Sequence, residues 1–332
     1  MRKGEIFMKK RIMSFVALGM SALLLTACSS SNKTDDNTLK VGIIQYVEHQ
    51  SLDDIYAGIV DELESNGYKD GVNIEIDYQN AQGDQSNLKT ISSKFVNDNS
   101  DIIIAIATPS AQAVASETSE IPIIGASITD MVSAGLVESN EKPNTNITGV
   151  SDMPPVEEQL NILLELVPNA KKIGIAYCTN EVNSEVQVNI ALDYLKSKGI
   201  EPVITTVTNS NDISQAISSI AGKVDGLFIP VDNIMASAMP TVSSICEENK
   251  LPIVTGASVM VEQGSVGTSA FDYYDAGKQT GKMAIRILNG EKPENTPVEF
   301  VTETKIYLNK TFADKIGLDI PQSIIDKASE IY

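Results

Sequence analysis

The sequence predicts an α/β protein of two lobes, each built around a mainly parallel β-sheet. The chain has 332 residues, more than one hydrophobic core usually supports. Short continuous apolar segments alternate with segments whose apolar residues recur at helical spacing, as expected for parallel strands joined by crossover helices. This alternation runs through the first part of the chain and restarts near residue 156. We therefore expect two lobes of similar construction.

The first run of alternation begins near residue 40. Leu52, Ile55 and Ile59 share one face of a segment that Ser51 is suited to cap and Gly67 to end. The expected strands are residues 40–44, 73–80, 101–107 and 121–126. The expected helices are residues 51–66, 88–96 and 111–117.

The second run repeats this construction. The expected strands are residues 172–177, 202–207, 226–231 and 252–255. The expected helices are residues 156–167, 182–198, 213–221 and 241–248. Continuous apolar strands with crossover helices favour sheets covered on both faces.

The end of the chain is too short for a third lobe. It comprises an expected strand over residues 266–271, a helix over 274–288 and an extended segment over 298–307. We expect these pieces to complete the first lobe and then the second. Three hinge crossings result, near Thr148, Ala270 and Pro297. The predicted lobes are residues 38–148 plus 271–297 and residues 149–270 plus 298–332.

The first 27 residues predict a secretory signal peptide. Three basic residues at 9–11 precede an apolar run over residues 12–25. This run is shorter than the roughly 20 residues that span a bilayer. Small residues then precede Cys28. Glu5 is unusual in a basic region, so translation from Met8 is an alternative to Met1.

The segment Leu25-Thr26-Ala27-Cys28 resembles a bacterial lipobox, whose cysteine is lipidated. Residues 28–37 are polar without an apolar period, and they predict a flexible tether between lipid and folded body. The alternative is an ordinary signal peptide with a coincidental cysteine.

The charge and the remaining cysteines limit the possible partners. The formal net charge is −19, and it becomes −23 without residues 1–27, which argues against nucleic acid as a partner.

Cys178 and Cys246 could form one disulfide. Two buried free thiols are favoured, because Cys178 ends an expected strand and Cys246 lies in an expected helix.

The sequence carries few groups for catalysis. His49 is the only histidine, so any Ser-His-Asp or Cys-His arrangement would have to use it. A metal site with two or more histidine ligands is excluded. No CxxC, GxGxxG or P-loop signature is present. We expect no enzyme activity, no metal and no cofactor.

Polar residues follow the expected strands, where ligands bind in open parallel sheets. The candidates are Gln45, His49, Thr108, Ser110, Ala111, Gln112, Ser127, Thr129, Ser151, Asp152, Asn183, Ser184, Asp232, Asn233 and Asp272. None of them is a lysine or an arginine. Tyr273 is one of four tyrosines that fit either an aromatic ligand or the core.

The segment Thr108-Pro109-Ser110 predicts the start of a helix, with Thr108 as N-cap and Pro109 as first helical residue. The free amides of Ser110, Ala111 and Gln112 would then favour an anion such as a carboxylate. Plain helix capping without a ligand is the alternative. An ammonium group would need a carboxylate, for which the candidates are Asp152, Asp232 and Asp272, although each also suits a cap or turn.

Several segments in order resemble one known family. They are LKVGIIQYVEH, GDQSN, IATPSAQ, ITGVSD, VPNAKKIGIAY, IPVDN, DYYDAGKQTGKMAIRIL and GEKPENTPVE. From about residue 39 to 325 the chain resembles the ABC-transporter substrate-binding lipoproteins of the aromatic amino acid type. The resemblance implies a type I periplasmic-binding-protein fold, with two Rossmann-like lobes joined by three hinge crossings.

The resemblance also implies a binding role. Thr108, Ser110, Ala111 and Gln112 would bind a carboxylate, and Gln45 and His49 would contact the ligand side chain. The residues expected to line the rest of the cleft are Ser127, Ser151, Asp152, Ser184, Asp232, Asn233 and Asp272.

The expected protein is therefore a monomer, lipid-anchored through Cys28 outside the cytoplasm of a Gram-positive bacterium. It would deliver tryptophan, tyrosine or phenylalanine to an ABC permease and its ATPase. A sugar, a nucleoside or another small metabolite is the alternative ligand, and a sensory lipoprotein is the alternative role.

Overall fold

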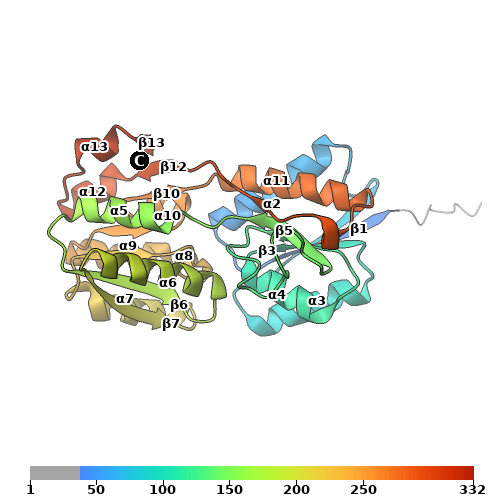
Figure 1. Cartoon of the computed structure of the whole chain (residues 1–332), viewed down its shortest axis with the longest axis horizontal. Helices are drawn as coiled ribbons and strands as arrows, with labels where there is room; N and C mark the ends of the chain where they lie inside the picture. The colour runs from blue at the N-terminus through green and yellow to red at the C-terminus, as the bar shows by residue number, and fades with distance from the viewer. Residues whose placement is uncertain (1–37) are drawn as a thin grey trace, which may run out of the picture. The chain divides into compact units, whose positions relative to one another are not determined.

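The computed structural model describes residues 38–332, coloured from blue to red in Figure 1. The predicted signal peptide over residues 1–27, the lipidated Cys28 and the tether over 28–37 lie outside the described residues. Among the residues that are described, no helix is both long and apolar enough to cross a membrane.

The first sheet has six parallel strands in the order β11-β5-β4-β3-β1-β2. The strands are β1 (Leu39–Gln45), β2 (Ile74–Asn80), β3 (Ile102–Ile106), β4 (Ile123–Ala126), β5 (Ile147–Ser151) and β11 (Glu299–Phe300). Every residue of β3, β4 and β5 is buried, because helices cover both faces of the sheet. This explains why their sequences are rich in apolar residues.

Two pairs of helices cover the first sheet (Figure 1). The helices are α2 (Gln50–Ser65), α3 (Gln85–Asn97), α4 (Thr108–Glu117) and α11 (Tyr273–Leu288). Helix α2 packs against α11 and α3 packs against α4. Glycines allow α2 and α11 to approach closely: a Cβ atom on Gly58 would lie 2.2 Å from the Tyr274 carbonyl oxygen, and one on Gly277 would lie 2.3 Å from that of Ile55.

The second sheet has seven strands in the order β13-β12-β10-β9-β8-β6-β7. They are β6 (Lys172–Cys178), β7 (Glu201–Val207), β8 (Gly226–Ile229), β9 (Ile253–Thr255), β10 (Gly267–Ala270), β12 (Lys305–Leu308) and β13 (Ala328–Ile331). Only the β10–β12 pair is antiparallel. The two parallel-dominated sheets confirm the predicted α/β fold of two lobes.

Helices of the second lobe connect and cover its strands. They are α5 (Val156–Leu166), α6 (Val182–Ser197), α7 (Ile213–Ala221), α8 (Asn233–Ser237), α9 (Met239–Asn249), α10 (Ser258–Glu262), α12 (Lys310–Ile316) and α13 (Gln322–Ile325). Helix α5 packs against α6, and α7 packs against α9. The short helices α8 and α10 were not predicted, because five residues are too few to display a helical period.

Strand pairing places two of the three crossings later than expected. Thr148 lies inside β5, whose five residues are buried beside β4. The chain therefore leaves the first sheet after Ser151. Similarly, Pro297 precedes β11, which still pairs with β5 in the first sheet, so the last crossing falls over residues 301–304. The second crossing follows β10, which ends at Ala270 as expected.

Candidate functional site

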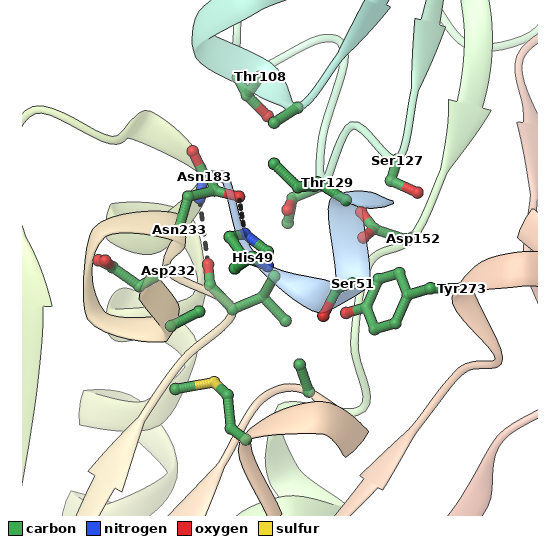
Figure 2. Close-up of a pocket in the computed structure, with 16 residues that line it drawn as sticks. His49, Ser51, Thr108, Ser127, Thr129, Asp152, Asn183, Asp232, Asn233 and Tyr273 are labelled. Carbon is green, nitrogen blue, oxygen red and sulfur yellow. Dashed lines mark hydrogen bonds between the residues drawn. The ribbon is translucent and has the colours of Figure 1, made fainter. Parts of the chain in front are cut away.

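A narrow cavity lies beyond the carboxyl ends of strands from both sheets (Figure 2). From the first lobe and its connections it is lined by His49, Ser51, Leu52, Ala107, Thr108, Ser127, Thr129, Asp152 and Tyr273. From the second lobe it is lined by Asn183, Val231, Asp232, Asn233, Ala236, Ala257 and Met260.

The β3–α4 turn holds Thr108 at the cavity. Ala107, not Thr108, is the N-cap of α4, with φ 75° and ψ 154°. Thr108 is instead the first helical residue, because the Ala107 carbonyl already accepts the amide of Ala111 at 3.2 Å. The Thr108 hydroxyl therefore caps nothing, and its Oγ1 is buried without a hydrogen-bond partner. A buried hydroxyl in this condition is available to a ligand.

The first turn of α4 differs from the expected anion site. The amide of Ala111 is not free, because it donates to Ala107. The amides without an intrahelical partner in the first turn are those of Thr108 and Ser110. The Ser110 Oγ is also buried without a partner, whereas the Gln112 Nε2 donates to the Ala134 carbonyl at 3.0 Å. Thr108 lines the cavity and residues 110–112 do not.

Two strained residues flank the same edge of the first sheet. Ala107 follows β3 and Ser127 follows the adjacent β4, and both have positive φ values, of 75° and 54°. Such conformations cost about 1–3 kcal/mol in residues other than glycine and concentrate at functional sites. The Ser127 Oγ is buried without a partner at the cavity wall. This strained edge therefore places unpaired polar groups at the cavity.

Asp152 is the one acid of the cavity wall that lacks a partner on one oxygen. It follows β5, its side chain is buried, and its Oδ1 has no hydrogen bond. Burial raises its pKa from an ordinary value to about 7. No lysine or arginine lines the cavity to compensate its charge. Asp152 is thus suited to receive a cationic group of a ligand.

Asp232 has a different environment. It caps α8: its Oδ1 accepts the amide of Met235 at 2.8 Å. Its Oδ2 accepts the Cys178 amide at 2.6 Å and the Ser184 hydroxyl at 2.8 Å. Both oxygens are therefore occupied by the second lobe itself. Ser184 serves this cap and does not line the cavity.

Glu181 is a buried acid that was not among the predicted binding residues. Its Oε1 accepts the Ile234 amide at 2.9 Å, and its Oε2 accepts the Asn233 amide at 3.1 Å and the Asn183 side chain at 3.0 Å. Burial, and next the nearby Asp232, raise the pKa of Glu181. Its position directly before α6, close to a strand end, was the available signal of a role at the site.

His49 connects the two walls of the cavity. It is the N-terminal flanking residue of α2, and its Nε2 lies 3.2 Å from the Asn233 Oδ1 of α8. Burial lowers the pKa of His49 to about 4, so the ring is neutral near pH 7. Gln45 lies behind this loop: its Nε2 donates to the Val47 carbonyl at 3.0 Å and to Asp53 at 2.8 Å. Gln45 therefore holds the loop and does not line the cavity.

Two further predicted residues lie away from the cavity wall. The Ser151 Oγ donates to the Thr129 carbonyl at 2.9 Å, which fixes the loop that carries Thr129. Asp272 caps α11 by accepting the amide of Asp275 at 3.2 Å, and it lies 3.6 Å from Lys305. Asp272 belongs to a surface groove beside the last crossing.

Six of the thirteen predicted binding residues line the cavity: His49, Thr108, Ser127, Asp152, Asp232 and Asn233. The seven that do not are Gln45, Ser110, Ala111, Gln112, Ser151, Ser184 and Asp272. The lining residues outside this set of thirteen are Ser51, Leu52, Ala107, Thr129, Asn183, Val231, Ala236, Ala257, Met260 and Tyr273. Most of these are apolar, and only their positions after strand ends could have suggested them.

Residues 38–332 contain no group of three or more side chains arranged to hold a metal ion. Cys178 and Cys246 are both buried and are not joined to each other. Burial raises the pKa of each thiol to about 12.

Comparisons with known proteins agree with this architecture. The family model described as ABC transporter substrate binding protein matches residues 40–332. The chain belongs to this family. The resemblance predicted from the sequence motifs is therefore confirmed. As a substrate-binding protein, the chain acts with a transporter permease and ATPase on a small-molecule ligand outside the cytoplasm.

Three relatives are informative. A tyrosine-binding protein of Clostridioides difficile is 43% identical over 312 residues, covering 91% of this chain and 90% of that protein. An ABC domain from Streptococcus pneumonia in complex with L-Trp is 40% identical, with a TM-score of 0.86, covering 89% of this chain and 100% of that one. A ligand-free, open substrate-binding protein of Clostridium difficile is 44% identical, with a TM-score of 0.66. The match covers 88% of this chain and 99% of that one.

The fold of this chain matches the two solved structures, the L-Trp complex and the open protein, to different degrees. The open, ligand-free protein is slightly more similar in sequence, yet the fold matches the L-Trp complex better. Sequence divergence therefore does not explain the lower TM-score.

Proposed function

We propose that this substrate-binding protein captures an aromatic L-amino acid, tryptophan, tyrosine or phenylalanine, between its two lobes. The observation that carries the proposal is Asp152, a buried carboxylate with an unpartnered oxygen in a cavity without lysine or arginine. An ammonium group would supply the missing partner. Two relatives, a tyrosine-binding protein and an ABC domain in complex with L-Trp, support the same class.

The α-carboxylate of the ligand would bind at the strained edge of the first sheet. Thr108 and Ser127 offer buried hydroxyls without partners there. The first turn of α4 adds the free amide of Thr108 and the positive end of the helix dipole. Asp152 lies beside Ser127 in Figure 2. The ammonium group of the zwitterion would therefore bind at Asp152, and its carboxylate at Thr108 and Ser127.

The rest of the cavity wall is suited to an aromatic side chain. Leu52 and Tyr273 contribute apolar surface from the first lobe, and Ala236, Ala257 and Met260 from the second. Methionine and tyrosine both pack favourably against aromatic rings. A sugar would leave this apolar wall opposite its hydroxyl groups, which makes sugars and nucleosides the less favoured ligands.

We further propose that ligand capture is coupled to closure of the lobes, without chemical change to the ligand. Each lobe contributes part of the cavity wall. The ligand would therefore bind the closed state more tightly than the open state and shift the population towards it. The hinge would comprise the crossings after Ser151, after Ala270 and over residues 301–304. The closed form would then be the one presented to the permease, whereas a sensory protein would report the same closure to another partner.

The N-terminal predictions remain part of the proposal. We propose a monomer whose signal peptide, residues 1–27, is removed and whose Cys28 carries the lipid of a Gram-positive membrane anchor. Metabolic labelling with a radioactive fatty acid tests this directly. Label is expected in the wild type and absent in Cys28→Ser, whereas Cys246→Ser serves as the matched control and should retain it. Equal labelling of the wild type and Cys28→Ser would contradict the anchor.

A thermal-shift screen tests the ligand class. The protein from residue 29 onward would be heated with each of the twenty amino acids, common sugars and nucleosides. A ligand at 100 times its Kd adds about 2.7 kcal/mol of stability. Each kcal/mol raises the Tm of a protein of this size by at most about 2–4 °C. Stabilisation by tryptophan, tyrosine or phenylalanine is expected. Stabilisation by a sugar or nucleoside alone would overturn the aromatic amino acid proposal.

A further inference from the structure

The buried Glu181 belongs to a hydrogen-bonded chain that reaches across the cavity. It stands at the start of α6, and three N–H groups of the second lobe converge on it: the amides of Asn233 and Ile234 and the side chain of Asn183. The Asn233 Nδ2 also donates to its Oε2. Asn233 then meets His49 of the first lobe at 3.2 Å. The chain thus consists of Glu181, Asn233 and His49.

This chain fixes the orientation of the Asn233 amide. Both oxygens of Glu181 accept backbone N–H groups, so the carboxylate presents acceptors towards Asn233. Asn233 must therefore turn its Nδ2 towards Glu181 and its Oδ1 towards His49. A flipped amide would place two acceptors, the Asn233 Oδ1 and Glu181, against each other.

The orientation of Asn233 in turn selects the tautomer of His49. An amide oxygen only accepts, so the hydrogen on the His49 ring must lie on Nε2. A neutral imidazole carries one N–H group, which leaves Nδ1 as an acceptor. The His49 Nδ1 is buried without a partner, in a ring that lines the cavity. A buried acceptor in this state is unfavourable unless a donor reaches it.

We propose that Glu181 is a positioning residue: through Asn233 it fixes His49 as the Nε2–H tautomer, so that Nδ1 accepts a hydrogen bond from the side-chain donor of the ligand. That donor is the phenol O–H of tyrosine or the indole N–H of tryptophan. The ammonium group is not this donor, because Asp152 lies beside Ser127 and Tyr273, and His49 lies towards Asn183 and Asn233 (Figure 2). This inference rests on the proposed aromatic amino acid ligand.

The arrangement also ties recognition to closure. His49 belongs to the first lobe and Asn233 to α8 of the second, so the bond between them exists only when the lobes meet. In an open protein the ring is free to exchange tautomers and to titrate at about pH 6.5. The acceptor is thus defined only in the closed state, where the ligand side chain is enclosed.

Nitrogen NMR of the histidine ring tests the tautomer. His49 is the only histidine, so selective labelling gives one pair of ring signals that needs no assignment. The complex with L-tyrosine is expected to show a protonated Nε2 and a non-protonated Nδ1. A protonated Nδ1 in the complex would overturn the inference while leaving the ligand class intact. If no aromatic amino acid stabilises the wild type in the thermal-shift screen, the proposed function itself fails.

Affinities for L-tyrosine and L-phenylalanine test the roles of Glu181 and His49. The amide introduced by Glu181→Gln has only one acceptor oxygen, so this substitution should disorder the side chain of Asn233. We expect affinity for L-tyrosine to fall about tenfold more than affinity for L-phenylalanine, which has no side-chain donor. Glu185→Gln, an exposed neighbour on α6, is the matched control and should change neither affinity by more than about twofold.

His49→Gln separates the two bonds of the ring should Glu181→Gln fail to fold. A glutamine side chain can still donate to Asn233 but provides no ring Nδ1. The same selective loss of about tenfold for L-tyrosine is expected. An equal loss for tyrosine and phenylalanine in both variants would show that the chain only supports closure, and would overturn the proposed acceptor role.

Discussion

The two walls of the cavity satisfy their polar groups in opposite ways. On the second lobe, the carboxylates of Glu181 and Asp232 accept hydrogen bonds on all four oxygens from their own lobe. On the first lobe, the hydroxyls of Thr108 and Ser127 and the Oδ1 of Asp152 are buried without partners. The acids of the second lobe are therefore fully hydrogen-bonded before ligand arrives, and the Asn183 Oδ1 is the buried atom of that wall without a partner. The acid and the hydroxyls of the first wall would receive their partners from the ligand.

This difference separates residues that stabilise from residues that recognise. A buried polar atom without a partner costs about 1–3 kcal/mol. A zwitterionic ligand that supplies partners to the first wall would therefore remove this cost. Sequence position alone made Asp152 and Asp232 equivalent candidates for the ammonium group. Their hydrogen bonds distinguish them, and substitutions at the two sites should have opposite consequences.

The largest expected effect is on affinity at Asp152. Asp152→Asn removes the only unpartnered carboxylate of the described cavity wall and should weaken binding of L-tyrosine by about thirtyfold or more, because losing one member of a buried charge pair costs about 2–5 kcal/mol. Titration calorimetry measures the loss. Without ligand, the variant should be no less stable than the wild type, because burial raises the pKa of Asp152 to about 7 and so penalises its ionised form.

Asp232 should show the reverse pattern. Asp232→Ala removes the cap of α8 and leaves the Cys178 amide and the Ser184 hydroxyl without an acceptor. We expect the free energy of unfolding to fall by about 2–4 kcal/mol in urea denaturation. Equal destabilisation by Asp152→Asn would show that the two walls do not differ as described.

Acid should weaken ligand binding through His49. Burial lowers its pKa from 6.5 to about 4 in this arrangement, so the closed protein binds fewer protons than an open one between these values. The contribution to closure is complete above about pH 6.5 and is lost as the pH falls towards about 4. The loss in affinity reaches about three-hundredfold at most, since one pKa unit corresponds to a tenfold change.

Charged neighbours of His49 modify this pH dependence without reversing it. The hydrogen bond with Asn233 on α8, and next the charge of Asp53 on α2, partly oppose the lowering of the His49 pKa by burial. His49→Gln should flatten the dependence of affinity on pH between pH 6.5 and about 4. Asp152, the other titrating group of the wall, is present in both proteins and so does not distinguish them. An unchanged profile in the variant would assign the pH dependence to other groups.

The smallest expected effect is at Thr108. Thr108→Val keeps the shape of the side chain and removes its unpartnered hydroxyl, so affinity for L-tyrosine should fall about five- to tenfold. Thr241→Val, at an exposed position of α9, is the control and should leave affinity unchanged. A loss in both variants would mean that the measured effect is not specific to the cavity.

Most of the fold followed from patterns that span whole elements. Continuous apolar runs such as Ile102–Ile106 identified the buried strands, and the stripe of Leu52, Ile55 and Ile59 identified α2. The first crossing was misplaced because Ile147–Ser151 mixes apolar residues with threonine, glycine and serine in a strand of five. Its membership in the sheet depends on pairing with β4, which no local pattern reveals.

The site was predictable in position but less so in role. Thr108, Ser127 and Asp152 were predicted from strand ends and line the cavity, because parallel strands end at one edge of a sheet. The partner of each polar atom could not be read from spacing. Thr108 was expected to cap α4, yet Ala107 occupies the N-cap position without a side-chain hydrogen bond, and the threonine hydroxyl has no partner.

A double-mutant cycle on affinity tests the central claim most directly. Calorimetry would compare L-tyrosine with its analogue lacking the amino group, in the wild type and in Asp152→Asn. If Asp152 binds the ammonium group, removing the amino group weakens binding about thirtyfold or more in the wild type but only slightly in the variant. Equal losses in the two proteins would contradict the account, because Asp152 would then not be the partner of that group.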